Sequence, residues 1–288
     1  MGTWKSFDEH EQQVTGLVTS LRKLLHRAQT LVPDRPGIHI LAYHLIQAGT
    51  QFPVDVSLDI FKNQMRALQE NSMLCSLDEA VNKLREAKTI RDHFAVVTFD
   101  DAYDNFYTSA WPVMEELQIP VTLYVPVEFV EGNGSVPISG SDFLPPCTWD
   151  HLRKLTESKL VSIGSHSCTH QNLISLDSQS ARYEIVESRK KLEDKLSIPV
   201  TSFCYPRGLW SKRLEEIVME NYETAVVGGG LKISPRHWNP YRLYRLPIRR
   251  DMPDQIVDML HNAVWLEERF ASWVRPWRHR LQGNGHCG

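Results

Sequence analysis

Short apolar runs alternate with longer segments of helical periodicity along most of the chain. Apolar runs of about four to eight residues bounded by turn residues are typical of buried strands, whereas apolar residues three and four positions apart indicate amphipathic helices. The runs with strand character are 38–46, 95–101, 120–127, 160–166, 200–206 and 241–248. The segments with helical periodicity are 14–32, 61–73, 76–87, 109–118, 149–158, 176–196, 214–222 and 254–274.

This alternation predicts the fold class. Strands that alternate with helices indicate βαβ units and a parallel sheet. About six to eight such strands favour an α/β fold with a closed or nearly closed β/α barrel, in which reactive groups lie at the carboxyl ends of the strands. Residues 132–146 are rich in Gly, Ser and Pro and have no period, so we expect a long loop on one face rather than a domain linker.

The 288 residues are close to the upper size of a single hydrophobic core, so one main domain is expected. We divide the chain into an N-terminal amphipathic helical extension at 1–36, a barrel at 37–252, and a C-terminal helix and tail at 253–288. The first helix has basic residues between its apolar ones, and the tail combines Trp with Arg. These two segments could form a peripheral membrane contact, although a solvated helix that covers the barrel is the favoured interpretation.

Net charge, termini and cysteines narrow the class of protein. A formal charge of −3 gives no electrostatic reason to expect nucleic acid. The first residues are charged and polar where a secretory signal would be apolar, and no apolar run approaches the roughly 20 residues of a membrane span. The five cysteines are widely spaced without a CxxC pair, which favours a reducing compartment. We therefore expect a cytoplasmic protein, or alternatively one that is peripheral at the inner face of the membrane. No feature of the sequence indicates an oligomeric state.

Two adjacent aspartates raise the question of chemistry. The stretch VVTFDDAYDN places Asp100 and Asp101 at the end of a predicted strand, where their mutual repulsion is relieved if a cation lies beside them. The next comparable strand end carries His166 and His170 in SHSCTH. Two histidines and one carboxylate make a three-ligand metal site with open positions, which is a catalytic pattern. Each signal is weak alone, since Asp pairs are frequent on surfaces.

The three motifs TFDDAYDN, SHSCTH and FCYPRG resemble, in order and spacing, the first three motifs of the NodB-homology polysaccharide deacetylases, carbohydrate esterase family four. The resemblance extends over about residues 38–250. It implies a distorted (β/α)7 barrel and one divalent metal, usually zinc, with cobalt or nickel sometimes accepted. It further implies that Asp100 is the general base and that the metal ligands are Asp101, His166 and His170.

The resemblance also implies groups for the remaining steps. The backbone N–H of Arg207 occupies the position that donates to the oxyanion in relatives, and Tyr205 with Pro206 would shape that turn. Relatives usually place the general acid in a late Leu-His motif, which the segment RLPIRRD lacks. The early segment LAYHLI resembles the YH segment of the poly-N-acetylglucosamine deacetylases, so His44 is the candidate acid and His237 the next one.

Two departures from the family pattern, and one cysteine near the predicted metal ligands, need an explanation. The residue after the Asp pair is usually Gly and is Ala102 here, a change that we expect to be tolerated if its φ is negative. The Arg that orients the base in many relatives falls at Cys204, so Arg207 or Arg245 is expected to replace it. Cys168 lies between the two histidines, but we do not expect it to bind metal because three ligands are already supplied.

The predicted function is a metal-dependent hydrolase that removes an N-acetyl group from an amino sugar of a glycan or glycoconjugate, with a carbohydrate or glycolipid substrate. One alternative is a sugar O-acetyl esterase, which uses the same metal and base on an easier leaving group. Another is a non-catalytic carbohydrate-binding barrel. The presence of all four Asp and His residues argues against the last, because binding alone does not require them.

Overall fold

The computed structural model describes residues 36–261, except for residues 88, 135, 230, 231, 237, 253 and 254. The expected helix at 14–32, the Trp-rich tail and His237 lie outside the described residues. The expected boundaries at 36 and 252 therefore stay predictions. Within the described part, no helix is both long enough and apolar enough to cross a membrane.

Seven parallel strands form a closed barrel in chain order, as the alternation predicts. The strands are β1 (Ile38–Tyr43), β4 (Phe94–Phe99), β5 (Val121–Val125), β6 (Val161–Ser165), β7 (Ser202–Cys204), β8 (Thr224–Gly228) and β9 (Leu243–Pro247). The barrel closes where β1 pairs with β9. Six of the seven were predicted as strands; β8, a short run directly after a helix, was not singled out by the pattern. The fold is an α/β barrel of seven strands, so the predicted fold class is confirmed.

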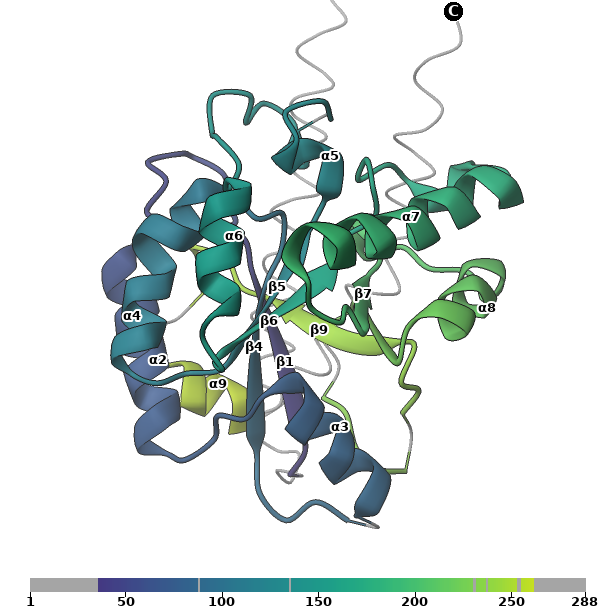
Figure 1. Cartoon of the computed structure of the whole chain (residues 1–288). Coiled ribbons are helices and arrows are strands. Elements are labelled where there is room, and N and C mark those ends of the chain that lie inside the picture. Colours follow the sequence, from purple (N-terminus) through teal and green to yellow (C-terminus); the bar gives the residue numbers. More distant parts are fainter. Residues whose placement is uncertain are drawn as a thin grey trace, which may run out of the picture.

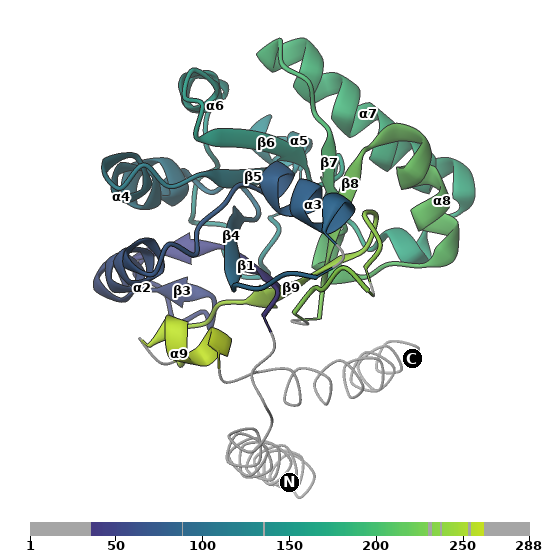
Figure 2. The same ribbon diagram turned by 90° about the horizontal axis from the view of Figure 1, so that it is seen from below.

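Helices surround the barrel (Figures 1 and 2). They are α2 (Leu58–Glu70), α3 (Leu77–Glu86), α4 (Trp111–Glu116), α5 (Val127–Val130), α6 (Trp149–Thr156), α7 (Ser178–Leu196), α8 (Lys212–Asn221) and α9 (Ile256–His261). Shorter elements are the strand pair β2 (Leu45–Ile46) and β3 (Asp55–Val56), the π-helix η1 (Phe106–Ala110), and the 3-10 turns η2 (Leu173–Ser175) and η3 (Pro206–Gly208). The carboxyl end of the barrel, where β5 leads into α5, is at the top of Figure 1.

Local capping explains where the helices begin. The Ser76 hydroxyl accepts from the N–H of Glu79 while the Glu79 carboxylate accepts from the N–H of Ser76, a capping box that starts α3. Helix α7 begins after Asp177, whose side chain accepts from two backbone N–H groups of the first turn. Because these caps are local, the helix starts could be expected from the sequence.

Alternation along β4 assigns its side chains to two different environments. Val97 and Phe99 belong to the large apolar cluster shared with the surrounding helices. Val96 lies in a second cluster with other strand residues and with α3, which covers the amino end of the barrel in the view from below (Figure 2). Thr98 and Asp100 continue the face of Val96 and are buried. The barrel interior is thus apolar at its amino end and polar at its carboxyl end, where the chemistry is expected.

One glycine makes room inside the barrel. A Cβ at Gly164 in β6 would lie 2.4 Å from the ring of Tyr124. Tyr124 is fully buried and its hydroxyl bonds the hydroxyl of Ser202 at 2.8 Å. Its ring also lies 5.5 Å from the guanidinium of Arg245. The absent side chain at 164 therefore lets an aromatic ring pack beneath the polar end of the barrel.

Candidate metal centre

The end of β4 turns through two residues of left-handed backbone. The N–H of Asp100 still donates to the carbonyl of Tyr43 at 2.9 Å. Asp101 then has φ 72° and Ala102 has φ 50°. Two residues of an extended strand would point to opposite faces, but this turn allows both carboxylates to lie at one site. The condition under which we expected Ala102 to be tolerated, a negative φ, is not met: alanine here adopts a conformation that glycine adopts without steric cost.

The loop after β6 carries the two histidines and is also held in left-handed backbone. Ser167 has φ 66° and His170 has φ 57°. The N–H of His170 donates to the Ser167 hydroxyl at 3.0 Å. The buried carboxylate of Glu184, on α7, accepts from both the N–H and the hydroxyl of Thr169, at 2.9 and 2.7 Å. Sequence reasoning did not find Glu184, because nothing local to α7 links it to this loop.

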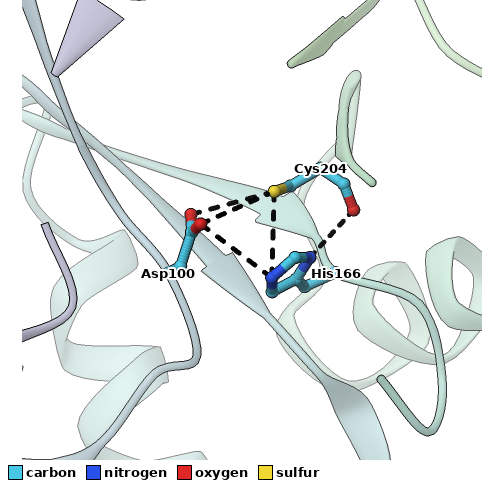
Figure 3. A group of neighbouring side chains, drawn as sticks. All are labelled: Asp100, His166 and Cys204. Atoms are coloured by element: carbon cyan, nitrogen blue, oxygen red, sulfur yellow. Dashed lines mark hydrogen bonds and ion pairs between the residues drawn. The ribbon is translucent and has the colours of Figure 1, made fainter. Parts of the chain in front are cut away.

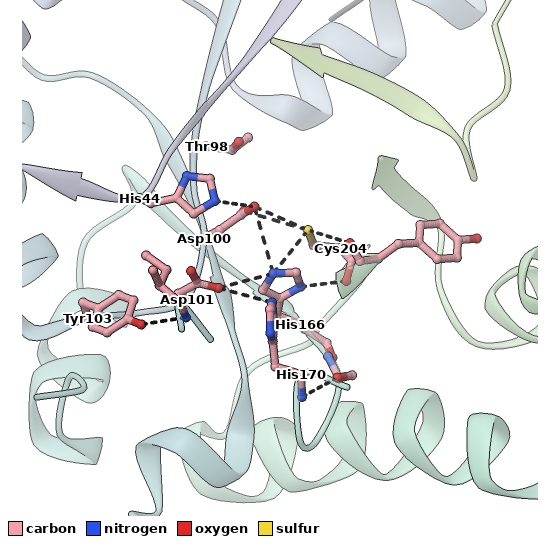
Figure 4. A network of polar contacts seen from close by, with 12 residues as sticks. His44, Thr98, Asp100, Asp101, Tyr103, His166, His170 and Cys204 are labelled. Atoms are coloured by element: carbon pink, nitrogen blue, oxygen red, sulfur yellow. Dashed lines mark hydrogen bonds and ion pairs between the residues drawn. The ribbon is translucent and has the colours of Figure 1, made fainter. Parts of the chain in front are cut away.

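Asp101, His166 and His170 converge on one point (Figure 4). The Oδ1 atom of Asp101 lies 3.5 Å from Nε2 of each histidine. Two ligands of a tetrahedral metal with bonds of about 2.0–2.1 Å are roughly 3.3 Å apart, so this spacing fits a shared divalent ion. The same oxygen is buried and has no hydrogen-bond partner, which a cation would supply. The three residues therefore fit the expected metal.

The protonation of the two histidines suits this role. Burial lowers the pKa of His166 to about 4, and burial together with His166 holds the pKa of His170 well below its usual value. Nδ1 of His166 lies 2.8 Å from the carbonyl of Cys204, which leaves Nε2 for the metal. Burial and the neighbouring Asp100 raise the pKa of Asp101 in the absence of a cation. Neutral imidazoles and a carboxylate that lacks a counter-charge are ligands ready for a divalent ion.

Asp100 lies in a different environment. Its two oxygens accept from Nη1 and Nη2 of Arg245 at 2.6 and 2.7 Å, and both side chains are buried. Burial alone would raise the pKa of Asp100, but the charge and hydrogen bonds of Arg245 outweigh it and hold the pKa well below its ordinary value. Of the two arginines expected to replace the missing one, the structure selects Arg245. Asp100 is thus kept ionised and oriented.

Cys204 lies beside Asp100 and His166 (Figure 3). Its Sγ lies 3.0 Å from Nη2 of Arg245 and 3.8 Å from both Asp100 oxygens and from Nε2 of His166. Asp100, His166 and Cys204 form a second set of possible ligands among the described residues. The adjacent guanidinium and the raised pKa of the buried thiol disfavour a cation there. Cys168 belongs to neither set, as expected.

His44 enters the site from the connection between β1 and β2. Its Nε2 lies 3.8 Å from Oδ2 of Asp100, and a fifth of its side chain is exposed. Its Nδ1 is buried without a hydrogen-bond partner. Burial lowers the pKa of His44 even though Asp100 opposes this shift. The structure thus places the candidate acid beside the candidate base, and its role stays a prediction.

Tyr205 and Arg207 flank the turn that follows β7. Tyr205 is fully buried, its hydroxyl donates to the carbonyl of Tyr241 at 3.3 Å, and its N–H donates to Val226. These contacts suit the expected role of shaping the turn. Arg207 has φ 59° in η3, and its charge contributes to the lowered pKa of His170. The turn is therefore near the metal ligands, while the oxyanion role of the Arg207 N–H stays a prediction.

Comparison with known proteins yields one family. Residues 87–225 match the family model described as polysaccharide deacetylase. Over 151 residues the chain is 26% identical to the poly-beta-1,6-N-acetyl-D-glucosamine N-deacetylase of Escherichia coli (strain K12), an alignment that covers 48% of this chain and 22% of that protein. The chain thus spans about a fifth of the length of this curated relative.

Solved structures agree on the fold. The deacetylase PplD of Streptococcus pyogenes, in complex with acetate, has a TM-score of 0.67 at 20% identity, covering 79% of this chain and 99% of that one. IcaB from Ammonifex degensii has a TM-score of 0.64 at 20% identity, covering 80% and 99%. The family match includes Asp100, Asp101 and both histidines of the metal centre. Residues 87–225 of this chain thus match the polysaccharide deacetylase family, and the chain has a NodB-type barrel.

Proposed function

We propose that this protein is a metal-dependent hydrolase that removes the N-acetyl group from an amino sugar of a glycan or glycoconjugate. One observation carries the proposal. At the carboxyl end of the barrel, an ionised carboxylate, Asp100, lies next to a second one, Asp101, whose oxygen is unpartnered and equidistant from two neutral histidines. A base held outside a three-ligand metal set is the arrangement that hydrolysis of an amide requires.

The residues divide the reaction into separate tasks. A divalent ion held by Asp101, His166 and His170 would lower the pKa of water and polarise the acetamide carbonyl. Asp100 takes the proton of the attacking water, and Arg245 fixes the carboxylate in position. The N–H of Arg207 donates to the developing oxyanion. Nε2 of His44 gives a proton to the departing sugar amine, so that acetate and the free amino sugar are the products.

The substrate class rests on the family and on the named relative. The family acts on polysaccharides, and the E. coli relative is named for N-deacetylation of a β-1,6-linked N-acetylglucosamine polymer. We propose zinc as the metal, since two imidazoles, one carboxylate and open positions suit it, with cobalt or nickel as functional substitutes.

Acetate release tests this proposal. Purified protein loaded with zinc would be incubated with N-acetylglucosamine oligomers of β-1,4 and β-1,6 linkage, with an N-acetylated glycolipid, and with O-acetylated sugars. We expect stoichiometric acetate and free amine from at least one N-acetylated glycan. Acetate from the O-acetylated sugars alone would identify an esterase, and no acetate from any of them would favour a binding barrel.

A further inference from the structure

A cavity of about 430 Å³ lies beside the loop that carries His170. It is formed by the end of that loop, by Leu176 directly after η2, and by the first turns of α7. Gln171, which directly follows the candidate metal ligand His170, is part of its wall, so the cavity borders the loop at the carboxyl end of the barrel. The residues that line it are Gln171, Leu176, Gln179, Ser180, Tyr183 and Glu184.

Some side chains that line the cavity make hydrogen bonds within the protein, and others keep polar groups that a ligand could bind. The Ser180 hydroxyl donates to Asp177, and the Glu184 carboxylate accepts from Thr169. In contrast, the structure gives no side-chain hydrogen bond to Gln171, Gln179 or Tyr183 within the part of the chain that it describes. More than half of the Tyr183 side chain is exposed. Two free amides and a free phenol therefore face a partly enclosed space.

This set of side chains suits a sugar ring. The aromatic face of Tyr183 can stack on the C–H face of a pyranose. The amides of Gln171 and Gln179 offer both donors and acceptors, which match the hydroxyl groups of a sugar. The volume is at the lower part of the range of small-molecule sites, roughly 300–1,000 Å³. It suits one or two sugar rings rather than a long chain.

We propose that this cavity is a subsite for the sugar unit adjacent to the one that is deacetylated, in an oligosaccharide or polysaccharide. The proposal rests on the proposed function and deepens it. Glu184 forms part of the cavity wall and also holds Thr169, the residue before His170. Glu184 thus connects the proposed subsite to the segment that carries a metal ligand. This connection would fix the distance between the adjacent sugar and the acetamide that reacts. The protein therefore prefers longer chains over short ones.

Binding and turnover test this subsite separately. The dissociation constants of N-acetylglucosamine and of its β-1,6-linked and β-1,4-linked tetrasaccharides would be measured by calorimetry on the zinc-loaded Asp100→Asn protein. The same measurements follow with Tyr183→Ala, Tyr183→Phe and Gln179→Ala added. Met219→Ala is the matched control, because Met219 is a similarly exposed apolar side chain on α8 and does not line the cavity. The kcat/KM values of the corresponding variants with an intact Asp100 would be compared for the monosaccharide and the tetrasaccharides.

We expect Tyr183→Ala to weaken tetrasaccharide binding about fivefold or more, since one stacked ring contributes roughly 1 kcal/mol. Binding of the monosaccharide, which leaves the subsite empty, should change little, and Met219→Ala should alter neither affinity. Tyr183→Phe should retain most of the affinity if stacking dominates. If Tyr183→Ala weakens the binding of the tetrasaccharide but the protein releases no acetate, the subsite is supported and the proposed deacetylation is not. A tetrasaccharide affinity that no cavity variant alters, or the absence of any oligosaccharide binding, overturns the subsite.

Discussion

Asp100 and Asp101 are neighbours in the sequence and both are buried, yet their surroundings act on their carboxyl groups in opposite ways. Arg245 pairs with Asp100 through two short hydrogen bonds and keeps it ionised. Asp101 has no such partner, and an oxygen of its carboxylate faces two imidazoles. The first can accept a proton without leaving its place, whereas the second would be stabilised by a divalent metal.

This difference predicts that the two aspartates respond differently to the same substitution. Asp100→Asn should retain metal near the wild-type content and lower kcat by about 10²-fold or more, the scale of a lost general base. Asp101→Asn should lose both metal and activity. Elemental analysis and acetate release measure the two effects. Asp104→Asn is the control, because Asp104 lies in the same segment but pairs with His151 instead. If Asp100→Asn empties the site, the two roles are exchanged.

His44 makes a prediction that depends on the leaving group. An amine departs poorly unless it is protonated, whereas an activated phenolate can depart alone. His44→Ala should therefore slow amide hydrolysis by about 10²-fold or more but affect an activated acetyl ester much less, with normal metal content. Rates on the two substrates give the ratio, and His151→Ala serves as the histidine control. Equal losses on both substrates would mean that His44 positions the substrate or supports the fold, and His237 would be tested next.

At the scale of elements, the base and its partner come from strands that are not adjacent in the barrel. Asp100 follows β4 and Arg245 lies in β9, with β1 between these strands. Nη1 of Arg245 also donates to the Thr98 hydroxyl at 3.1 Å, which ties the guanidinium to β4 at a second point. Closure of the barrel between β1 and β9 thus brings the positive charge of Arg245 to Asp100.

Removal of that charge should shift the pH dependence of the reaction. Without Arg245, burial is no longer opposed and raises the pKa of Asp100. Because the ionised form is the active base, activity is present above this pKa and lost below it, so the acid limb of kcat/KM should move to higher pH. We expect about one pH unit or more for Arg245→Met, since an opposite charge commonly shifts a carboxyl by 1–3 units. Arg245→Lys should shift the limb less.

Profiles of kcat/KM against pH measure this effect, with circular dichroism to confirm that each variant is folded. Arg242→Met is the matched control, because Arg242 lies just before the same strand but pairs with the partly exposed Glu215. An acid limb that stays in place in both Arg245 variants would show that another group controls the ionisation of the base.

At the scale of the whole molecule, the barrel gathers residues from distant parts of the chain at one end. The metal centre joins the turn after β4 to the loop after β6, and each of these is left-handed at two or more positions. A cation that bridges them would add a cross-link between two βα connections. Metal binding is therefore expected to stabilise the barrel as well as to activate it.

We predict about one divalent ion per chain, loss of acetate release on chelation, and recovery when zinc is added. The melting temperature should fall on chelation, because a ligand that binds only the folded state stabilises it. Elemental analysis, acetate assays and calorimetric scans measure these quantities. The Asp101→Asn protein should show no further change with chelator. Active protein that contains no metal would falsify the assignment.

The sequence by itself determined the alternation of strands and helices, the starts of capped helices, and the residue types at the strand ends. These are local properties: burial of one face sets the hydrophobic period, and a cap bonds backbone within its own turn. The order of strands followed because consecutive βα units pack side by side. From these the barrel, the aspartate pair and both histidines could be predicted.

Only the tertiary structure decided the contacts between distant positions and the backbone conformation at the turns. Arg245 lies 145 residues from Asp100 in sequence, and no local pattern distinguishes it from Arg207. The positive φ of Ala102 could not be read from the sequence, because the packed turn imposes a conformation that alanine alone does not favour. The anchoring of Thr169 by Glu184 and the cavity beside His170 likewise depend on how α7 packs against the barrel, and packing is a property of the whole chain.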